Sequence, residues 1–334
     1  MDEPLYNMQM AVSTPETTVS RALERLEPFE DSTAPPPTLN TDGEFHLVLI
    51  REEKGSVVKI VRETIGESRR DGLLFEALIT DHAHTALEAS RFAIPRVIEC
   101  DLLCGSPYME VEYIPGQSFS EDELAETLSD EEKAQLGRDM SEFAYAFSET
   151  LSLGQLSKMQ EGLSLRIPDR EKHIIDYFDR VGNALDHSHP VLTDTIYALQ
   201  DTHARLQKEG KLEPTIIGHD DLRAPNIILA PADQYGVRRL KGVVDFQITK
   251  PSSFERELRH LAPLGEVAVE AAMKRTQELT GRELSREVFD FWAIGQMATT
   301  CGMGLRRYGY CQPSRVAYLR RMFPNKDWDE LQAV

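Results

Sequence analysis

Positive charge is scarce in this chain: 37 Lys and Arg residues stand against 56 Asp and Glu residues, which gives a net charge of −19. Because nucleic acids are bound through clustered Lys and Arg side chains, we expect no nucleic-acid partner. The acidic surface favours solubility as its main role. A cationic small-molecule substrate is the alternative that the same charge would suit.

Long apolar runs and paired cysteines are also missing. No run approaches the roughly 18 residues needed to cross a membrane, so we expect no membrane partner. The segment MDEPLYNMQM is acidic and lacks the basic and apolar regions of a secretory signal. The four cysteines have no CxxC spacing and no nearby histidine to complete a zinc site. We therefore predict a cytoplasmic protein with reduced thiols.

The first part of the chain is rich in β-branched residues and predicts a small β-rich lobe. Residues 45–50 and 56–62 are separated by a turn-like segment and indicate an antiparallel hairpin. Residues 72–87 have helical spacing. Two further strands are expected at residues 93–100 and 106–116.

The rest of the chain predicts helices. Ser129 and Glu132 form an S-x-x-E capping box at the start of one helix. Further helices are expected at about 169–186, at 192–210 and from residue 254 onward. The fold class is therefore α+β.

Three regions are expected along the 334 residues, which are enough for two lobes with substantial cores. Residues 1–38 form a tail with a short helix at 15–29. Residues 39–116 form the small lobe, and residues 117–334 form a large helical lobe.

The stretch IIGHDDLRAPNIILA, residues 216–230, places a polar cluster inside an apolar run. Its Ile and Leu residues indicate two strand-like pieces, and Pro225 prevents a regular helix between them. A charged loop held by buried strands is a common location for catalytic groups. The alternative is a surface hairpin whose charges are simply solvated.

Five polar residues occur in an order that suits phosphoryl transfer: Lys59, Glu76, Asp221, Asn226 and Asp245. Each alone is more typical of a solvated surface or a turn. Together they supply a lysine for the phosphates, a glutamate to hold it, and an aspartate to orient the acceptor hydroxyl. The asparagine and the last aspartate are hard ligands suited to Mg²⁺. This set predicts a kinase.

The motif HDDLRAPN followed by VVDF resembles the HGDxxxxN and IDF motifs of the aminoglycoside phosphotransferases and related small-molecule kinases. AIPRVIEC and MEVEYIPG resemble a strand and the hinge of that family. The resemblance runs through residues 39–261 in these short motifs. It implies a bilobal protein-kinase-like fold that binds ATP or GTP with Mg²⁺. The implied reaction moves the γ-phosphate to a hydroxyl of a small molecule.

The resemblance also implies roles for individual residues. Asp221 would be the catalytic base, and His219 would brace its loop. Asn226 and Asp245 would hold magnesium. The remaining positions would bind the nucleotide: Lys59 paired with Glu76, the backbone of Glu112 and Ile114, and the loop of residues 41–45 with Gly43.

A protein kinase is the nearest alternative, because HDDLRAPN also resembles the HRDLRxxN loop of those enzymes. Three features argue against it. About 100 residues separate Gly116 from His219, which is much more than a protein kinase has between its hinge and its catalytic loop. VVDFQ lacks the glycine of D-F-G, and no A-P-E-like segment follows Asp245. A nucleotide-binding pseudokinase scaffold is a further alternative, against which the intact set of five polar residues argues.

Two departures from the family pattern stand out. Asp220 occupies the position of the family glycine, and we expect its carboxylate to point to solvent. A raised pKa in one of two adjacent carboxylates, or cation binding, is the alternative. Glu257 with Leu258 replaces an Asp-Leu pair, which keeps the carboxylate but alters the fine geometry expected for the support of the loop.

The acceptor pocket is expected in the helical lobe, around residues such as Tyr177, Asp179, Trp292 and Tyr308. These side chains fit a core or surface position as well as they fit a pocket. The negative charge of the chain favours an amine-bearing acceptor, such as an aminoglycoside or an amino alcohol. The oligomeric state is left open.

Overall fold

The computed structural model describes residues 38–40, 46–61, 68–103, 106–161, 163 and 189–331. The predicted tail and short helix before residue 38, the loop with Gly43 and the helix at 169–186 lie outside these residues. The chain divides into two units, Met1–Leu74 with Val97–Tyr113, and Phe75–Arg96 with Ile114–Val334.

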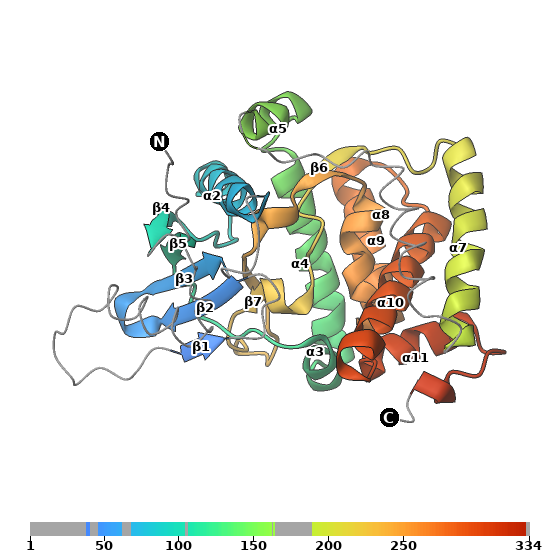
Figure 1. The fold of residues 1–334 in the computed structure, drawn as a ribbon. Helices are drawn as coiled ribbons and strands as arrows, with labels where there is room; N and C mark the ends of the chain where they lie inside the picture. Colours follow the sequence, from blue (N-terminus) through green and yellow to red (C-terminus); the bar gives the residue numbers. More distant parts are fainter. Residues whose placement is uncertain are drawn as a thin grey trace, which may run out of the picture. The chain divides into compact units, whose positions relative to one another are not determined.

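The first unit is built on an antiparallel sheet (Figure 1). In spatial order its strands are β1 (Thr38–Asn40), β2 (His46–Arg51), β3 (Ser56–Val61), β5 (Ser106–Glu112) and β4 (Val97–Leu103). β2 pairs with β3 from one end to the other, so the predicted hairpin is confirmed. Because alternate residues of a strand share a face, one side of the sheet carries a small core. Its members are Leu47, Leu49, Val58, Ile60 and Tyr108.

The second unit is mainly helical (Figure 1). Its helices are the part of α2 (Ser68–Ala86) after Leu74, α3 (Glu121–Thr127), α4 (Asp130–Ser148), α5 (Leu153–Gln160), α7 (Pro190–Lys208), α8 (Phe254–Glu257), α9 (Glu266–Thr280), α10 (Arg286–Tyr308) and α11 (Pro313–Met322). Short 3₁₀ helices are η1 in the first unit (Glu52–Lys54), and η2 (Ala224–Asn226), η3 (Phe246–Ile248), η4 (Leu258–Leu264) and η5 (Asp329–Leu331) in the second. The expected α+β architecture, with a small β-rich part and a large helical part, is confirmed.

Capping boxes stabilise the first turns of helices α3 and α4 in this unit. Ser129 accepts a hydrogen bond from the backbone of Glu132, whose side chain accepts from the backbone of Ser129, as the sequence predicts. The same reciprocal pair forms at Ser120 with Glu123 before α3. Each box satisfies two backbone donors that a helix end leaves unpaired.

Helices α4 and α9 lie side by side and form the centre of the helical core (Figure 1). Gly137 permits their close approach, because a Cβ atom at this position would lie 2.2 Å from the carbonyl oxygen of Ala268. One turn further on, Ser141 Oγ donates a hydrogen bond to the carbonyl oxygen of Ala272 at 2.9 Å. Phe143 and Phe147 follow on α4 and are fully buried.

Short strands hold the polar stretch of residues 216–230, and their pairing rules out the alternative of a hairpin. The two apolar pieces do not form a hairpin with each other. Instead β6 (Ile216–Gly218) pairs with β9 (Lys250–Ser252), and β7 (Ile227–Leu229) pairs with β8 (Leu240–Val243). Each piece finds its partner in a later segment, so the loop between them is fixed at both ends by a different strand pair.

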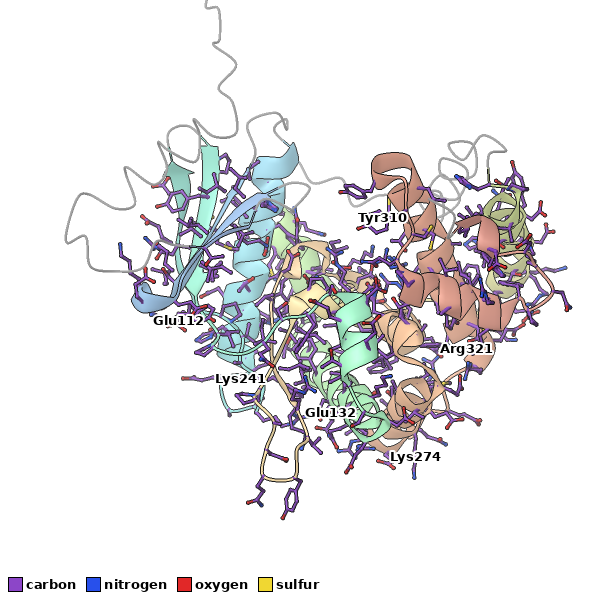
Figure 2. The ribbon with its side chains drawn as sticks, turned by 90° about the horizontal axis from the view of Figure 1, so that it is seen from below. Glu112, Glu132, Lys241, Lys274, Tyr310 and Arg321 are labelled. Atoms are coloured by element: carbon purple, nitrogen blue, oxygen red, sulfur yellow. The ribbon has the colours of Figure 1, made fainter. Side chains whose placement is uncertain are left out.

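Helix α4 anchors the β7–β8 pair through two acidic side chains. Glu132, labelled in Figure 2, accepts a hydrogen bond from Arg238 Nε at 2.7 Å. Asp139 is fully buried and accepts from the backbone N–H of Leu240 at 3.0 Å. These contacts fix the start of β8, the strand that leads to Asp245.

The predicted strand at residues 93–100 begins only at Val97. Ala93 instead forms a parallel bridge with Gly242, and its N–H donates to the carbonyl oxygen of Lys241 at 2.7 Å. The cause is Pro95, which lacks the N–H that a ladder needs. None of the helices in the described ranges combines the length and the apolar composition needed to cross a membrane.

Replacing Gly137 with alanine tests the close packing of α4 on α9. The added methyl group would clash with backbone at Ala268, so we expect a loss of about 1–3 kcal/mol in the free energy of unfolding, measured by urea denaturation. Gly154→Ala is the matched control, because a Cβ there meets nothing within 4 Å. That variant should change stability by less than about 1 kcal/mol, and equal losses in the two variants would contradict the packing.

Candidate active site

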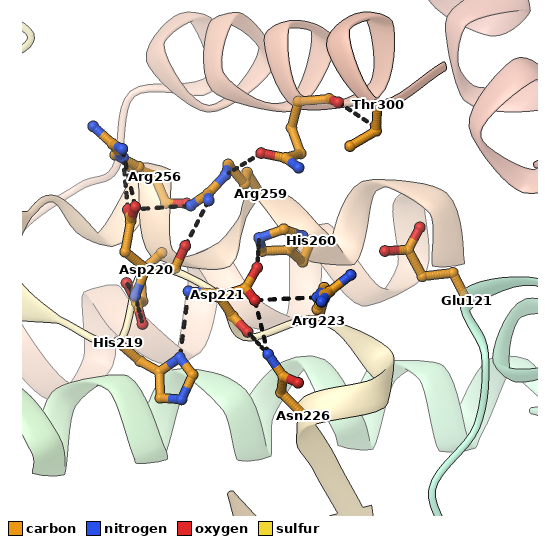
Figure 3. A network of polar contacts seen from close by, with 12 residues as sticks. Glu121, His219, Asp220, Asp221, Arg223, Asn226, Arg256, Arg259, His260 and Thr300 are labelled. Atoms are coloured by element: carbon orange, nitrogen blue, oxygen red, sulfur yellow. Dashed lines mark hydrogen bonds and ion pairs between the residues drawn. The ribbon is translucent and has the colours of Figure 1, made fainter. Parts of the chain in front are cut away.

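The loop of residues 219–226 lies between β6 and β7 and carries the predicted catalytic groups (Figure 3). The residue before the loop is Gly218, where an added Cβ would lie 2.3 Å from a carboxylate oxygen of Glu257. The loop ends in the 3₁₀ helix η2, where the fixed φ angle of Pro225 suits a first turn. Strand pairs therefore hold both ends of the loop, and Glu257 packs closely against the backbone at its start.

His219, the first residue of this loop, is fully buried. Its Nδ1 atom accepts a hydrogen bond from the backbone N–H of Asp221 at 3.3 Å, so its Nε2–H donates to the carbonyl oxygen of Val244 at 3.0 Å. Its ring meets Phe246 edge-on, with the centroids 4.7 Å apart. Burial lowers the pKa of His219, which keeps the ring neutral as this arrangement requires. His219 thus links the loop to the segment that carries Asp245.

Asp221 has two carboxylate oxygens in different surroundings. Oδ2 accepts hydrogen bonds from Asn226 Nδ2 at 2.8 Å and from Arg223 Nε at 3.1 Å. Oδ1 lies 3.7 Å from Nε2 of His260. The side chain is 14% exposed. One oxygen is therefore held by two donors, while the carboxylate as a whole still reaches the surface.

Asn226 and Asp245 are brought together through the backbone. The Val244 N–H donates to the carbonyl oxygen of Asn226 at 3.0 Å, and Asp245 is the next residue. Asp245 has left-handed backbone, with φ 69°. Both Nδ2 hydrogen bonds of Asn226 go to Asp221, which leaves its Oδ1 as the atom suited to a cation.

This donor set fits magnesium. An amide oxygen and a carboxylate are hard ligands, and Mg²⁺ is usually held by one or two such groups together with substrate phosphates and water. Within the described ranges, no group of three or more His, Cys, Asp or Glu side chains could hold a metal alone. Asn226 and Asp245 therefore fit a Mg²⁺ ion whose other ligands come from a nucleotide and water.

The structure corrects the expectation that Asp220 points to solvent. The residue is 2% exposed, and its carboxylate meets Lys250 Nζ at 2.6 Å. It also meets Arg256 Nε at 2.6 Å and Arg259 at 3.4 Å (Figure 3). Burial alone would raise the pKa of this carboxyl group, but the charges of Arg256, Lys250 and Arg259 outweigh it and hold the pKa far below its usual range. Asp220 is a buried anchor.

Backbone geometry explains why a glycine suits the position of Asp220 in the family motif. Its φ angle is 61°, in the left-handed region where glycine is unstrained. Asp tolerates this region better than most residues, at a cost of about 1–2 kcal/mol. The three cationic partners offset that cost.

Glu257 supports the same residue from the other side. Its carboxylate accepts the backbone N–H of Asp220 at 2.8 and 3.1 Å. Burial, followed by the charge of Asp220, raises the pKa of Glu257 to about 7. The carboxylate that replaces the family aspartate therefore still holds the loop.

Four residues of this network were missed in the sequence: Lys250, Arg256, Arg259 and His260. The run ERELRH carries a signal, because Arg256 and Arg259 are three apart and so share a helical face. Nothing in the pattern indicated that this face meets Asp220. His260 had no local signal at all.

The predicted nucleotide-binding residues are divided between the two units. Lys59 lies on β3 opposite Val48 and Met109, and Glu112 ends β5 opposite Ser56. Glu76 is buried on α2, and Ile114 is buried in the second unit. The pairing of Lys59 with Glu76 joins the two units and stays a prediction, as does the loop with Gly43.

The suggested acceptor residues take different positions. Trp292 is buried, and the guanidinium group of Arg256 lies 4.5 Å from its ring centroid, so it supports the Asp220 network instead of a pocket wall. Tyr308 is exposed at the end of α10. Tyr177 and Asp179 lie outside the described residues.

Comparison with known proteins decides the family. Residues 40–254 match the model of the phosphotransferase enzyme family, APH. The chain belongs to this family. It is therefore a small-molecule phosphotransferase, as the sequence predicts. No curated protein is matched by the sequence.

Solved structures of family members share the fold of this phosphotransferase. The GDP and kanamycin complex of APH(2")-IIia has a TM-score of 0.66 and 16% identity, covering 94% of this chain and 98% of that chain. The macrolide 2'-phosphotransferase MphH from Brachybacterium faecium has a TM-score of 0.56 and 13% identity, covering 94% of this chain and all of that chain (100%). The expected protein-kinase-like fold is confirmed.

Removing the charge of Asp220 tests its role as an anchor. In Asp220→Asn three cations lose their buried partner, so we expect a loss of about 3 kcal/mol in the free energy of unfolding. The control is Asp329→Asn, which breaks a pair with Arg320 whose aspartate is 80% exposed. That change should be worth less than about 1 kcal/mol. Similar losses in urea denaturation of the two variants would contradict the anchor.

The raised pKa of Glu257 predicts a pH dependence of stability. Unfolded Glu257 releases its proton near pH 4.3, whereas the folded protein keeps it until about pH 7. Between these values the folded state binds more protons, so stability falls as the pH rises. Relative to Glu257→Gln, the wild type should lose up to about 3 kcal/mol from pH 5 to pH 7.5 in urea denaturation. Parallel curves for the two proteins would contradict the shift.

Proposed function

We propose that this phosphotransferase moves the γ-phosphate of a nucleoside triphosphate, ATP or GTP, to a hydroxyl group of a small molecule. The observation that carries the proposal is the Asp221 carboxylate. One oxygen is held by Asn226 and Arg223, and the side chain still reaches the surface.

Asp221 acts as the base in this reaction. The acceptor oxygen forms a bond to the γ-phosphorus as the bond from that phosphorus to the leaving oxygen breaks, and the hydroxyl proton passes to Asp221. Because Asn226 and Arg223 occupy Oδ2, the proton goes to Oδ1. His219 keeps the base in place by accepting its backbone N–H. Catalysis then comes mainly from positioning and electrostatics.

Asn226 and Asp245 hold magnesium in this proposal. Bound Mg²⁺ neutralises charge that develops on the phosphates during transfer. The small lobe of residues 39–116 binds the nucleotide. Its contacts are Lys59, paired with Glu76 of helix α2, the loop with Gly43, and the hinge backbone at Glu112 and Ile114.

A cationic acceptor suits the net charge of −19. Similar structures contain kanamycin with GDP, or gentamicin. We extend the proposal to an amine-bearing acceptor of this chemical class, an aminoglycoside or an amino alcohol. A protein substrate or a nucleotide-binding scaffold is the alternative, and the same experiment separates both of these from a small-molecule acceptor.

The test is ATP consumption by purified protein with magnesium and pooled hydroxyl compounds. Asp221→Ala should lower the turnover that a pool stimulates by at least about 100-fold, because it removes the general base. Its nucleotide binding, measured by thermal shift, should be unchanged. The control Asp201→Ala replaces an exposed aspartate on α7 and should keep full turnover.

Two outcomes would contradict the proposal. Turnover retained in Asp221→Ala would show that Asp221 is not the base. Nucleotide binding by the wild type without turnover in any pool would favour a protein substrate or a scaffold.

A further inference from the structure

His260 lies on the 3₁₀ helix η4, and its side chain is next to that of Asp221 (Figure 3). Its side chain is only 1% exposed, and its Nε2 atom is 3.7 Å from Oδ1 of Asp221. This is the carboxylate oxygen that neither Asn226 nor Arg223 occupies. His260 therefore faces the part of the proposed base that the loop itself leaves open.

The two ring nitrogens of His260 have an unusual environment. Among the described residues, neither nitrogen has a hydrogen-bond partner. A buried polar atom without a partner costs about 1–3 kcal/mol, and such atoms are rare in folded proteins. The other buried residues of this helix include Leu258, Leu261 and Leu264, which are apolar and carry no such cost. An apolar side chain at this position would avoid the cost.

A small movement of the His260 ring toward Asp221 would give Nε2 a hydrogen-bond partner. Catalytic hydrogen bonds are often long in the absence of substrate and shorten in the reacting complex. Shortening the 3.7 Å contact by less than 1 Å would let Nε2–H donate to Oδ1 of Asp221. A carboxylate oxygen accepts two hydrogen bonds, so Oδ1 can still take the acceptor's hydroxyl.

The ring is suited to donate without adding charge. Burial, followed by the charges of Arg259 and Arg223, lowers the pKa of His260 well below its usual value. A cation at this distance would make Asp221 a weaker base. A neutral imidazole can orient the carboxylate without adding a second cation beside Arg223.

We propose that His260 is a positioning residue for the transfer reaction, whose Nε2–H holds Oδ1 of Asp221 toward the acceptor hydroxyl. This rests on the proposed function of Asp221 as the base. His260 does not touch the substrate and acts only through Asp221.

Three substitutions test the proposal in the full-length protein. His260→Phe keeps a ring of similar size and removes the donor. His260→Gln carries an amide nitrogen about as far from the backbone as Nε2, whereas the amide nitrogen of His260→Asn reaches only the position of Nδ1. Measurements of kcat, and of KM for both nucleotide and acceptor, separate positioning from binding.

We expect His260→Phe to lower kcat by about 10- to 100-fold, which corresponds to a hydrogen bond to a charged group. The KM for nucleotide should stay unchanged. His260→Gln should recover most of the rate, and His260→Asn should not. A merely structural role would give Gln and Asn the same effect. If His260→Phe fails to fold, as judged by circular dichroism, the comparison of Gln with Asn decides.

A second measurement does not depend on activity. The ¹⁵N NMR signals of the His260 ring in the wild type should show a protonated Nε2 and a bare Nδ1. The opposite tautomer, a kcat of His260→Phe within about twofold of the wild type, or equal rescue by Asn and Gln would overturn the proposal.

The wild type serves as the reference for the proposed function itself. Turnover by the wild type that is lost in Asp221→Ala supports that function, and the His260 variants then test the further inference alone. Nucleotide binding by the wild type without turnover on any acceptor would overturn both.

Discussion

The catalytic loop depends on one buried carboxylate. Asp220 sits among Lys250, Arg256 and Arg259, and the backbone on its two sides is held by Glu257 and Arg259. Removing one partner from such a buried group leaves uncompensated charge, which makes the arrangement hard to distort. Because Asp221 is the next residue, the position of the proposed base follows from the anchoring of its neighbour.

Adjacent aspartates thus take opposite roles because of their surroundings. Asp220 is surrounded by cations and stays ionised at any ordinary pH, so it is suited to structure and unsuited to proton transfer. Asp221 has one oxygen held by Asn226 and Arg223 and the other facing the neutral ring of His260. The same chemical group therefore serves as an anchor at one position and as the proposed base at the next.

Features that depend on local pattern could be predicted from the sequence. Three such features are the hairpin of β2 and β3, the capping box of Ser129 with Glu132, and the position of the loop at residues 216–230. Asp221 and Asn226 could be singled out in the same way, and the structure joins their side chains.

Features that depend on contacts distant in sequence could not be predicted. The partners of Asp220 come from the segment after β8, and the pairing of β6 with β9 brings Lys250 next to it. That pairing also rules out the alternative hairpin at residues 216–230, which the sequence left open because each short apolar strand had several partners of equal pattern. His260 has no periodicity or motif that marks it, and its relation to Asp221 exists only in three dimensions.

The most direct test of phosphate transfer to a small molecule is to follow the transferred phosphate itself. Wild-type protein would be incubated with ATP that carries a labelled γ-phosphate, together with magnesium and a pool of amine-bearing hydroxyl compounds, and the label would then be traced. We expect the label to appear as a phosphate ester on a small molecule. Label found only on protein, or remaining on ATP despite nucleotide binding, would contradict it.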